Sequence, residues 1–156
     1  MFSIAALLNK LVMFIGEYHH TLDPKKRLAI PAKFRKQLGE TAVLTKSLDN
    51  SLVLYPMKEW KQLAEKLSKL PVGQSGTRGF VRTMLAGASD VEIDSLGRVL
   101  VPDYLKDYAG LKKNAVITGL HNRLEIWDAE AWSEYKKNSE KNTGDIAEKL
   151  GELGVY

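Results

Sequence analysis

Hydrophobic and polar residues along the chain follow the same succession of patterns twice. In each copy a segment of alternating residues leads to an aspartate, as in Val91–Asp94, and a tight connection after it carries an arginine. A short apolar segment follows, Leu28–Ile30 in the first copy and Val99–Val101 in the second, and a proline ends it. This pattern predicts two strands joined by a tight loop in each copy.

The next part of each copy predicts a short helix and a β-hairpin. The helix has about two turns and ends at a glycine, Gly39 or Gly110, as helices commonly do. Two strands follow, and a polar turn with an asparagine joins them. We expect these strands at Ala42–Thr45 and Ser51–Tyr55 around Asn50, and at Ala115–Thr118 and Arg123–Trp127 around Asn122.

A longer helix closes each copy. In the first copy, apolar residues recur at helical spacing at Trp60, Leu63, Leu67 and Leu70. In the second, Asp128 can cap a helix that contains Trp132 and Tyr135. The tryptophans follow these amphipathic patterns, so burial in a core or interface is the favoured interpretation over stacking on a base.

The two copies match residue by residue over about forty positions. The matching segments are Asp23–Pro31 with Asp94–Pro102, Ala42–Thr45 with Ala115–Thr118, and Asn50–Tyr55 with Asn122–Trp127. Two copies are too few for a solenoid. We therefore expect an α+β fold made of two modules related by a pseudo-twofold axis.

The 156 residues suffice for one domain of ordinary size or for two small ones. Residues 1–12 are apolar but too short to span a bilayer, and they lack the basic start and cleavage site of a signal peptide. We interpret them as a non-native or wrongly assigned extension. After it we expect a first repeat with its helix at 13–70 and a second repeat at 88–138. A glycine-containing linker at 71–87, with a short helix near Phe80–Ala86, joins the two repeats. A loosely attached polar tail follows at 139–156.

Composition excludes several kinds of site. The chain has no cysteine, which rules out disulfides, thiolate metal sites and a cysteine nucleophile. The three histidines, His19, His20 and His121, lack the spacing of metal ligands, and no catalytic motif is present. We therefore expect no catalytic residue, no metal, no cofactor and no small-molecule substrate. No long apolar run occurs, which favours a cytoplasmic protein without a membrane partner.

Positive charge is concentrated early in the chain. The formal net charge is +4, but the stretch from Asp23 to Lys36 holds six cations and one acid. Its lysines Lys25 and Lys26 lie in the first loop, where they either belong to a solvated turn or contact phosphate. The other cations, Lys33, Arg35 and Lys36, lie on the following short helix, and we interpret them as a solvated face or as subunit contacts.

An Asp-x-x-x-Arg motif occurs at the same place in both repeats, at Asp23/Arg27 and Asp94/Arg98. Chance placement of eight Asp and six Arg residues would give less than one such match. Each aspartate can accept hydrogen bonds that close a turn and can pair with its arginine. Each arginine can also project toward phosphate or the edge of a guanine, where its planar fork binds. These two interpretations are compatible.

With these motifs the chain resembles the bacterial MraZ family. The resemblance runs from Met13 to about Tyr135 and includes Met13–Tyr18, both Asp-x-x-x-Arg loops and Ile30–Arg35. It also includes Tyr55-Pro56 with Glu59-Trp60, and Asn122–Trp127. The family commonly has glycine before the first arginine, and this sequence has Lys26. A positive φ at that position would strain Lys26.

The resemblance implies tandem SpoVT–AbrB-type modules in a swapped-hairpin-type β barrel with flanking helices, and assembly into a homo-oligomeric ring. It implies a nucleoid-associated repressor that binds short direct repeats in double-stranded promoter DNA of its own division and cell-wall operon. Carried onto this chain, Arg27 and Arg98 contact bases, Lys25 and Lys26 contact phosphate, and Asp23 and Asp94 orient the loops. A ring-shaped scaffold that binds another protein, with the Asp–Arg pairs acting only as turn staples, is the alternative.

Overall fold

The computed structural model describes residues 13–155, so the extension expected at residues 1–12 lies outside the described residues. The fold is α+β, and its elements follow in the same order in each half of the chain. The first half contains β1 (Phe14–Thr21), β2 (Arg27–Ala29), α2 (Ala32–Leu38), β3 (Thr41–Lys46), β4 (Leu52–Pro56), α3 (Met57–Ser68) and α4 (Ser75–Leu85). The second half contains β5 (Ser89–Glu92), β6 (Arg98–Leu100), α5 (Asp103–Tyr108), β7 (Asn114–His121), β8 (Leu124–Asp128) and α6 (Ala129–Glu152).

The strands of the two halves are interleaved in one six-stranded antiparallel sheet, in the order β1-β7-β8-β4-β3-β5. The first strand of each half pairs with the hairpin of the other half, since β1 lies beside β7 and β5 lies beside β3. The hairpins meet at the centre, where β4 pairs with β8. Neither half can therefore form its full set of strand pairs alone.

The short strands β2 and β6 form a second, two-stranded antiparallel sheet. Backbone hydrogen bonds extend this pairing into the adjoining loops, because the N–H of Ile30 donates to the carbonyl of Gly97 at 2.9 Å. At the equivalent place the N–H of Val101 donates to the carbonyl of Lys26 at 2.8 Å. These reciprocal bonds place the two loops side by side.

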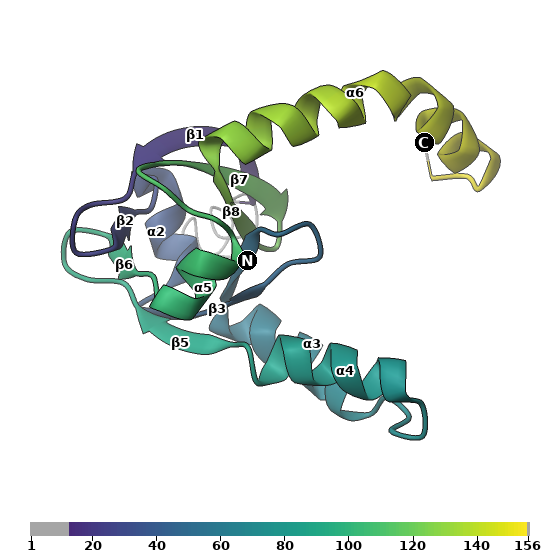
Figure 1. The fold of residues 1–156 in the computed structure, drawn as a ribbon, viewed down its shortest axis with the longest axis horizontal. Coiled ribbons are helices and arrows are strands. Elements are labelled where there is room, and N and C mark those ends of the chain that lie inside the picture. Colours follow the sequence, from purple (N-terminus) through teal and green to yellow (C-terminus); the bar gives the residue numbers. More distant parts are fainter. Residues whose placement is uncertain (1–12, 156) are drawn as a thin grey trace, which may run out of the picture.

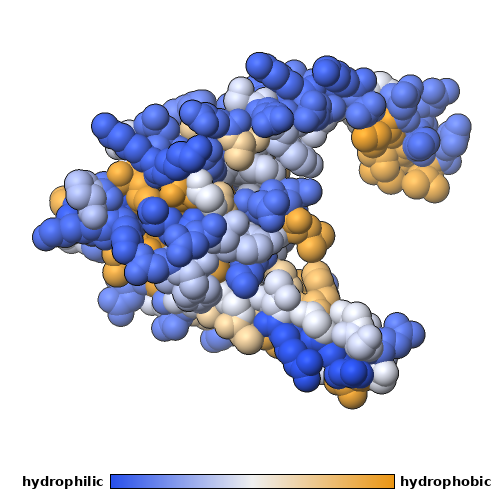
Figure 2. All heavy atoms as spheres, in the orientation of Figure 1, coloured by the Kyte–Doolittle hydropathy of each residue, from blue (hydrophilic) through white to orange (hydrophobic). Residues whose placement is uncertain are grey.

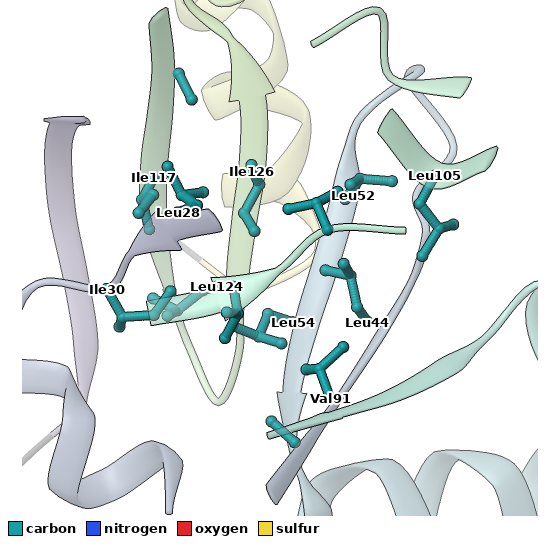
Figure 3. Packing of buried hydrophobic residues seen from close by; sticks show 14 of the residues in the cluster. Leu28, Ile30, Leu44, Leu52, Leu54, Val91, Leu105, Ile117, Leu124 and Ile126 are labelled. Atoms are coloured by element: carbon teal, nitrogen blue, oxygen red, sulfur yellow. The ribbon is translucent and has the colours of Figure 1, made fainter. Parts of the chain in front are cut away.

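The apolar core lies between the sheets and takes side chains from both halves (Figure 3). Leu28 and Val99 from the small sheet are completely buried against strands of the large sheet. Phe34 of α2 is 1% exposed and packs edge-on against the rings of Phe14, at 5.2 Å, and Tyr18, at 5.3 Å. This core positions the two loops because β2 and β6 are anchored in it.

Two helical arms extend from the end of the molecule opposite the β2–β6 loops (Figure 1). One arm contains α3 and α4, and the other is the 24-residue α6. No residue of α6 is buried, and Figure 2 shows hydrophobic residues gathered at its distal end. Among residues 13–155, the structure contains no helix that is long and apolar enough to cross a membrane.

The expected strands are confirmed with shifts of one to a few residues at their ends. The short helices end before Gly39 and Gly110, whose φ angles are 84° and 59°, and the side chain of Asp128 caps α6 by accepting the N–H of Ala131. The short helix expected at Phe80–Ala86 is instead the 11-residue α4, which begins at Ser75. The segment after 138 is not a separate tail, because α6 continues through it to Glu152.

Candidate nucleic-acid interface

The first Asp–Arg loop joins β1 to β2, and the side chain of its aspartate closes it. Oδ1 of Asp23 accepts hydrogen bonds from the backbone N–H of Lys25, at 2.9 Å, and of Arg27, at 2.8 Å. Oδ2 of the same carboxylate accepts a third hydrogen bond from Nε of Arg27 at 2.8 Å. One carboxylate thus holds both the backbone of the loop and the direction of the Arg27 side chain.

The second loop, between β5 and β6, has the same geometry. Oδ1 of Asp94 accepts hydrogen bonds from the backbone N–H of Leu96, at 3.0 Å, and of Arg98, at 2.8 Å. Oδ2 accepts from Nε of Arg98 at 2.9 Å. The repeated motif is therefore a repeated three-dimensional unit. Its three hydrogen bonds have equivalent partners in the two loops, and their lengths differ by at most 0.1 Å.

These hydrogen bonds stabilise the charged form of both carboxylates. The backbone N–H of Arg27 is the main cause that lowers the pKa of Asp23, and the backbone N–H of Arg98 does the same for the pKa of Asp94. Partial desolvation of each carboxylate opposes this effect without reversing it. Both aspartates are therefore ionised at neutral pH, and each arginine keeps a charged acceptor.

The β2–β6 ladder brings the two arginines to the same end of the molecule. Arg27 lies opposite Leu100, and Ala29 lies opposite Arg98. Nη1 of Arg98 lies 4.0 Å from Oδ2 of Asp23, so the second arginine also faces the first carboxylate. The Arg27 and Arg98 side chains are 32% and 27% exposed, which means that the core does not enclose them.

Each guanidinium keeps its outer nitrogens for a further contact. Nε of Arg27 and Nε of Arg98 donate within their own loops. The terminal nitrogens of both side chains make no hydrogen bond to any other residue in the range 13–155. A guanidinium held through Nε still presents two terminal nitrogens in its plane, the arrangement that binds a phosphate or the O6 and N7 atoms of guanine.

The two loops differ at the residue before the arginine. Lys26 has a φ of 63° and Gly97 a φ of 76°, so both occupy the left-handed region. The strain expected at Lys26 from the sequence is confirmed by this angle. Nζ of Lys26 also donates to Oδ1 of Asp103, the first residue of α5 in the other half of the chain.

Arg35 of α2 fills the space beside the second loop. Its Nε donates to the carbonyl of Ile30 at 2.9 Å, and a Cβ added to Gly97 would lie 2.0 Å from that Nε. We expected Arg35 to lie on a solvated face or in a subunit contact. That expectation is wrong for the part of the side chain near Nε, because Arg35 is half-buried against a loop of its own chain.

A hollow of about 400 Å³ lies beside both arginines, and acids line it as well as cations. Arg27 and Arg98 share its wall with Asp90, Glu92 and Asp94. Because the lining is mixed in charge, this hollow is a poor place for an isolated phosphate. The cationic groups of the loops that a large polyanion could reach are the arginine edges, the exposed Lys25 at the tip of the first loop and the partly exposed Lys26.

Comparison with known proteins agrees with this arrangement. The family described as MraZ protein matches residues 13–83 and 84–151, one match for each half. The chain belongs to the MraZ family. It is 50% identical to the transcriptional regulator MraZ of Clostridium acetobutylicum, 47% to that of Natranaerobius thermophilus and 50% to that of Oenococcus oeni. Each comparison covers 92% of this chain and the whole of the relative.

The chain has further cations on α2, next to the loops. Lys33 and Lys36 are exposed, and Nζ of Lys33 lies 4.9 Å from the centre of the Tyr18 ring and 5.0 Å from that of Phe34. These contacts agree with the expected solvated face. Within residues 13–155, no group of three or more His, Asp or Glu side chains is placed to hold a metal ion.

The contacts of two residues beside these loops were not predicted from the sequence. Asp103 and Arg35 each reach the loop of the other half, across separations of 77 residues to Lys26 and 62 to Gly97. The two residues do not occupy matching repeat positions, so the internal repeat gives no signal for them. Only the interleaved strand pairing brings each short helix against the opposite loop.

Proposed function

We propose that this MraZ-family protein is a DNA-binding transcriptional regulator that uses the two Asp–Arg loops to contact double-stranded DNA. Arg27 and Arg98 contact base edges, and Lys25 and Lys26 contact phosphates. Asp23 and Asp94 orient the loops. The observation that carries this proposal is the placement of two partly exposed arginines on adjacent strands. Each is held through Nε, and its terminal nitrogens make no hydrogen bond to any other residue in the range 13–155.

The relatives' names support the regulatory part of the proposal. We further propose that the chain consists of tandem SpoVT–AbrB-type modules in a swapped-hairpin-type barrel. It would act in the cytoplasm at the nucleoid as a repressor of its own division and cell-wall operon, without catalysing a reaction. Direct repeats in the promoter would suit neighbouring subunits that are related by rotation around a ring.

Exposed apolar residues on both arms support assembly into such a ring. The distal part of α6 presents Ile146 and Leu150, and Leu153 follows directly after the helix; these side chains are 51%, 38% and 76% exposed. On the other arm, Val72 and Phe80 are 72% and 40% exposed. A contact between two different surfaces of neighbouring copies is heterologous and closes a ring when the rotation permits. Several loop pairs would then bind adjacent repeats with avidity.

The test is a gel-shift titration with the promoter DNA of the protein's own gene and an unrelated duplex of equal length. Replacing Arg27 or Arg98 with alanine should cost roughly 1–3 kcal/mol per engaged site and weaken the preference for the promoter. Lys25→Ala should weaken binding to both duplexes alike and reduce the salt dependence.

Arg82→Ala is the matched control, because it removes an exposed arginine from α4 on the arm opposite the loops. This variant should bind both duplexes as the wild type does. Unchanged promoter affinity in the Arg27→Ala/Arg98→Ala double variant would refute the DNA-facing assignment. Salt-insensitive retention of one partner protein by the wild-type chain, without retention of DNA, would favour the scaffold function.

A further inference from the structure

The contact between Lys26 and Asp103 links a DNA-facing loop to the short helix of the other half. Nζ of Lys26 donates to Oδ1 of Asp103 across 77 residues of sequence. The two side chains are 42% and 70% exposed, so the pair lies at the surface. A dissolved or bound anion can therefore reach the same ammonium group.

The ion pair is not needed to close the loop. The second loop has Gly97 in place of Lys26 and makes the same hydrogen bonds to its aspartate, with equivalent lengths that differ by at most 0.1 Å. Exposed ion pairs also contribute little to folding stability. The consequence of the pair is therefore electrostatic: the carboxylate of Asp103 offsets the charge that Lys26 adds.

At the repeat position that corresponds to Asp103, the short helix beside the second loop has Ala32 and therefore no carboxylate. The second loop's neighbour from this short helix is Arg35, whose Nε, Cζ and Cδ atoms lie directly beside Gly97. The first loop thus has an acid next to its extra cation, and the second loop has a cation next to its glycine. The two loops have the same backbone geometry but unequal electrostatic surroundings.

We propose that Asp103 competes with DNA phosphate for the ammonium group of Lys26 and so lowers the sequence-independent part of the DNA affinity. The inference rests on the proposed function, because it requires that phosphate approaches the first loop. In the unbound protein Lys26 pairs with Asp103, and binding of DNA must replace this contact with a phosphate contact. Asp103 is a positioning residue, since it acts on DNA only through Lys26.

The test compares Asp103→Asn with Asp107→Asn. Asp107 is an exposed acid one turn further along α5, and its side chain makes no hydrogen bond or ion pair with any other residue in the range 13–155. Both variants remove one negative charge from the same helix. Asp103→Asn should tighten binding to promoter and unrelated duplex by the same factor, about two- to fivefold. It should also make the slope of the log binding constant against the log salt concentration steeper by up to about 0.9. Asp107→Asn should have a smaller effect on both the affinity and this slope.

The same pair of variants in a Lys26→Gly background completes the experiment. Glycine suits the φ of 63° and lacks the ammonium group, so Asp103→Asn should then act no more strongly than Asp107→Asn. Equal tightening by both variants in the wild-type background, or an Asp103→Asn effect that persists without Lys26, would overturn the inference. In either case the proposed function would stand if the Arg27→Ala/Arg98→Ala double variant still loses promoter binding. Wild-type protein that binds neither duplex would overturn both.

Discussion

Replacement of Gly97 with alanine should destabilise the protein through two separable effects. The first is backbone conformation, because a residue with a Cβ at a φ of 76° costs about 1–2 kcal/mol relative to glycine. The second is steric, because the new Cβ would lie 2.0 Å from Nε of Arg35. The Arg35 side chain must move away, and its hydrogen bond to the carbonyl of Ile30 is then lost.

The expected total follows from these two effects. Loss of a hydrogen bond of this kind costs about 1 kcal/mol, so Gly97→Ala should lower the free energy of unfolding by about 2–3 kcal/mol. For a chain of this length the melting temperature should fall by roughly 5–10 °C. Urea and thermal unfolding followed by circular dichroism measure both quantities.

A double-mutant cycle separates the two effects. In an Arg35→Ala background the side chain that Gly97→Ala would displace is gone, and only the backbone cost of about 1–2 kcal/mol should remain. Lys26→Gly is the control at the equivalent position. This substitution relieves the strain of a positive φ, but it removes the ion pair to Asp103 and makes the unfolded chain more flexible. Because these effects oppose each other, the free energy of unfolding should stay within about 1 kcal/mol of the wild-type value. An equal loss for Gly97→Ala with and without Arg35 would refute the steric part.

Three further predictions concern stability at acid pH, the helical arms and the core. Folding lowers the pKa values of Asp23 and Asp94, so the two carboxylates stabilise the fold above an ordinary carboxyl pKa of about 3.9. This stabilisation is lost as the pH falls below that value. Between pH 7 and pH 3, the melting temperature of the Asp23→Asn/Asp94→Asn variant should therefore fall less steeply than that of the wild type. Ile146→Glu with Leu150→Glu should reduce the assembled mass in light scattering without lowering helix content, since neither residue is buried. Phe34→Ala should cost about 3–5 kcal/mol in urea unfolding, because its ring is 1% exposed between two other aromatic rings.

Local sequence signals were enough to find the strands and both loops. The proline after each short apolar segment and the glycine after each short helix mark real boundaries, because Pro31 and Gly39 directly flank α2. The repeated Asp-x-x-x-Arg spacing also corresponds to a real structural unit. Such features depend on residues within about five positions of each other, and a single sequence contains that information.

Long-range packing explains what the sequence did not predict. The glycine-containing stretch before Phe80 suggested a loop, yet α4 already begins at Ser75 and includes Gly76 and Gly79. Met84 is 8% exposed, and its carbonyl accepts a hydrogen bond from the buried hydroxyl of Thr45 on β3 at 2.9 Å. Tertiary contact with the sheet thus outweighs the low helix propensity of the glycines.

The difference between the two loops combines both kinds of information. A reader of the sequence can see that Lys26 stands where the second repeat has Gly97, and can expect strain there. The sequence cannot show that Asp103 approaches one of these residues and Arg35 the other, because the interleaved sheet alone creates those contacts. The two loops thus differ in their own residues and also in the contacts that they receive from the other half. The electrostatic surroundings of each loop therefore depend on the fold of the whole chain as well as on the loop's own motif.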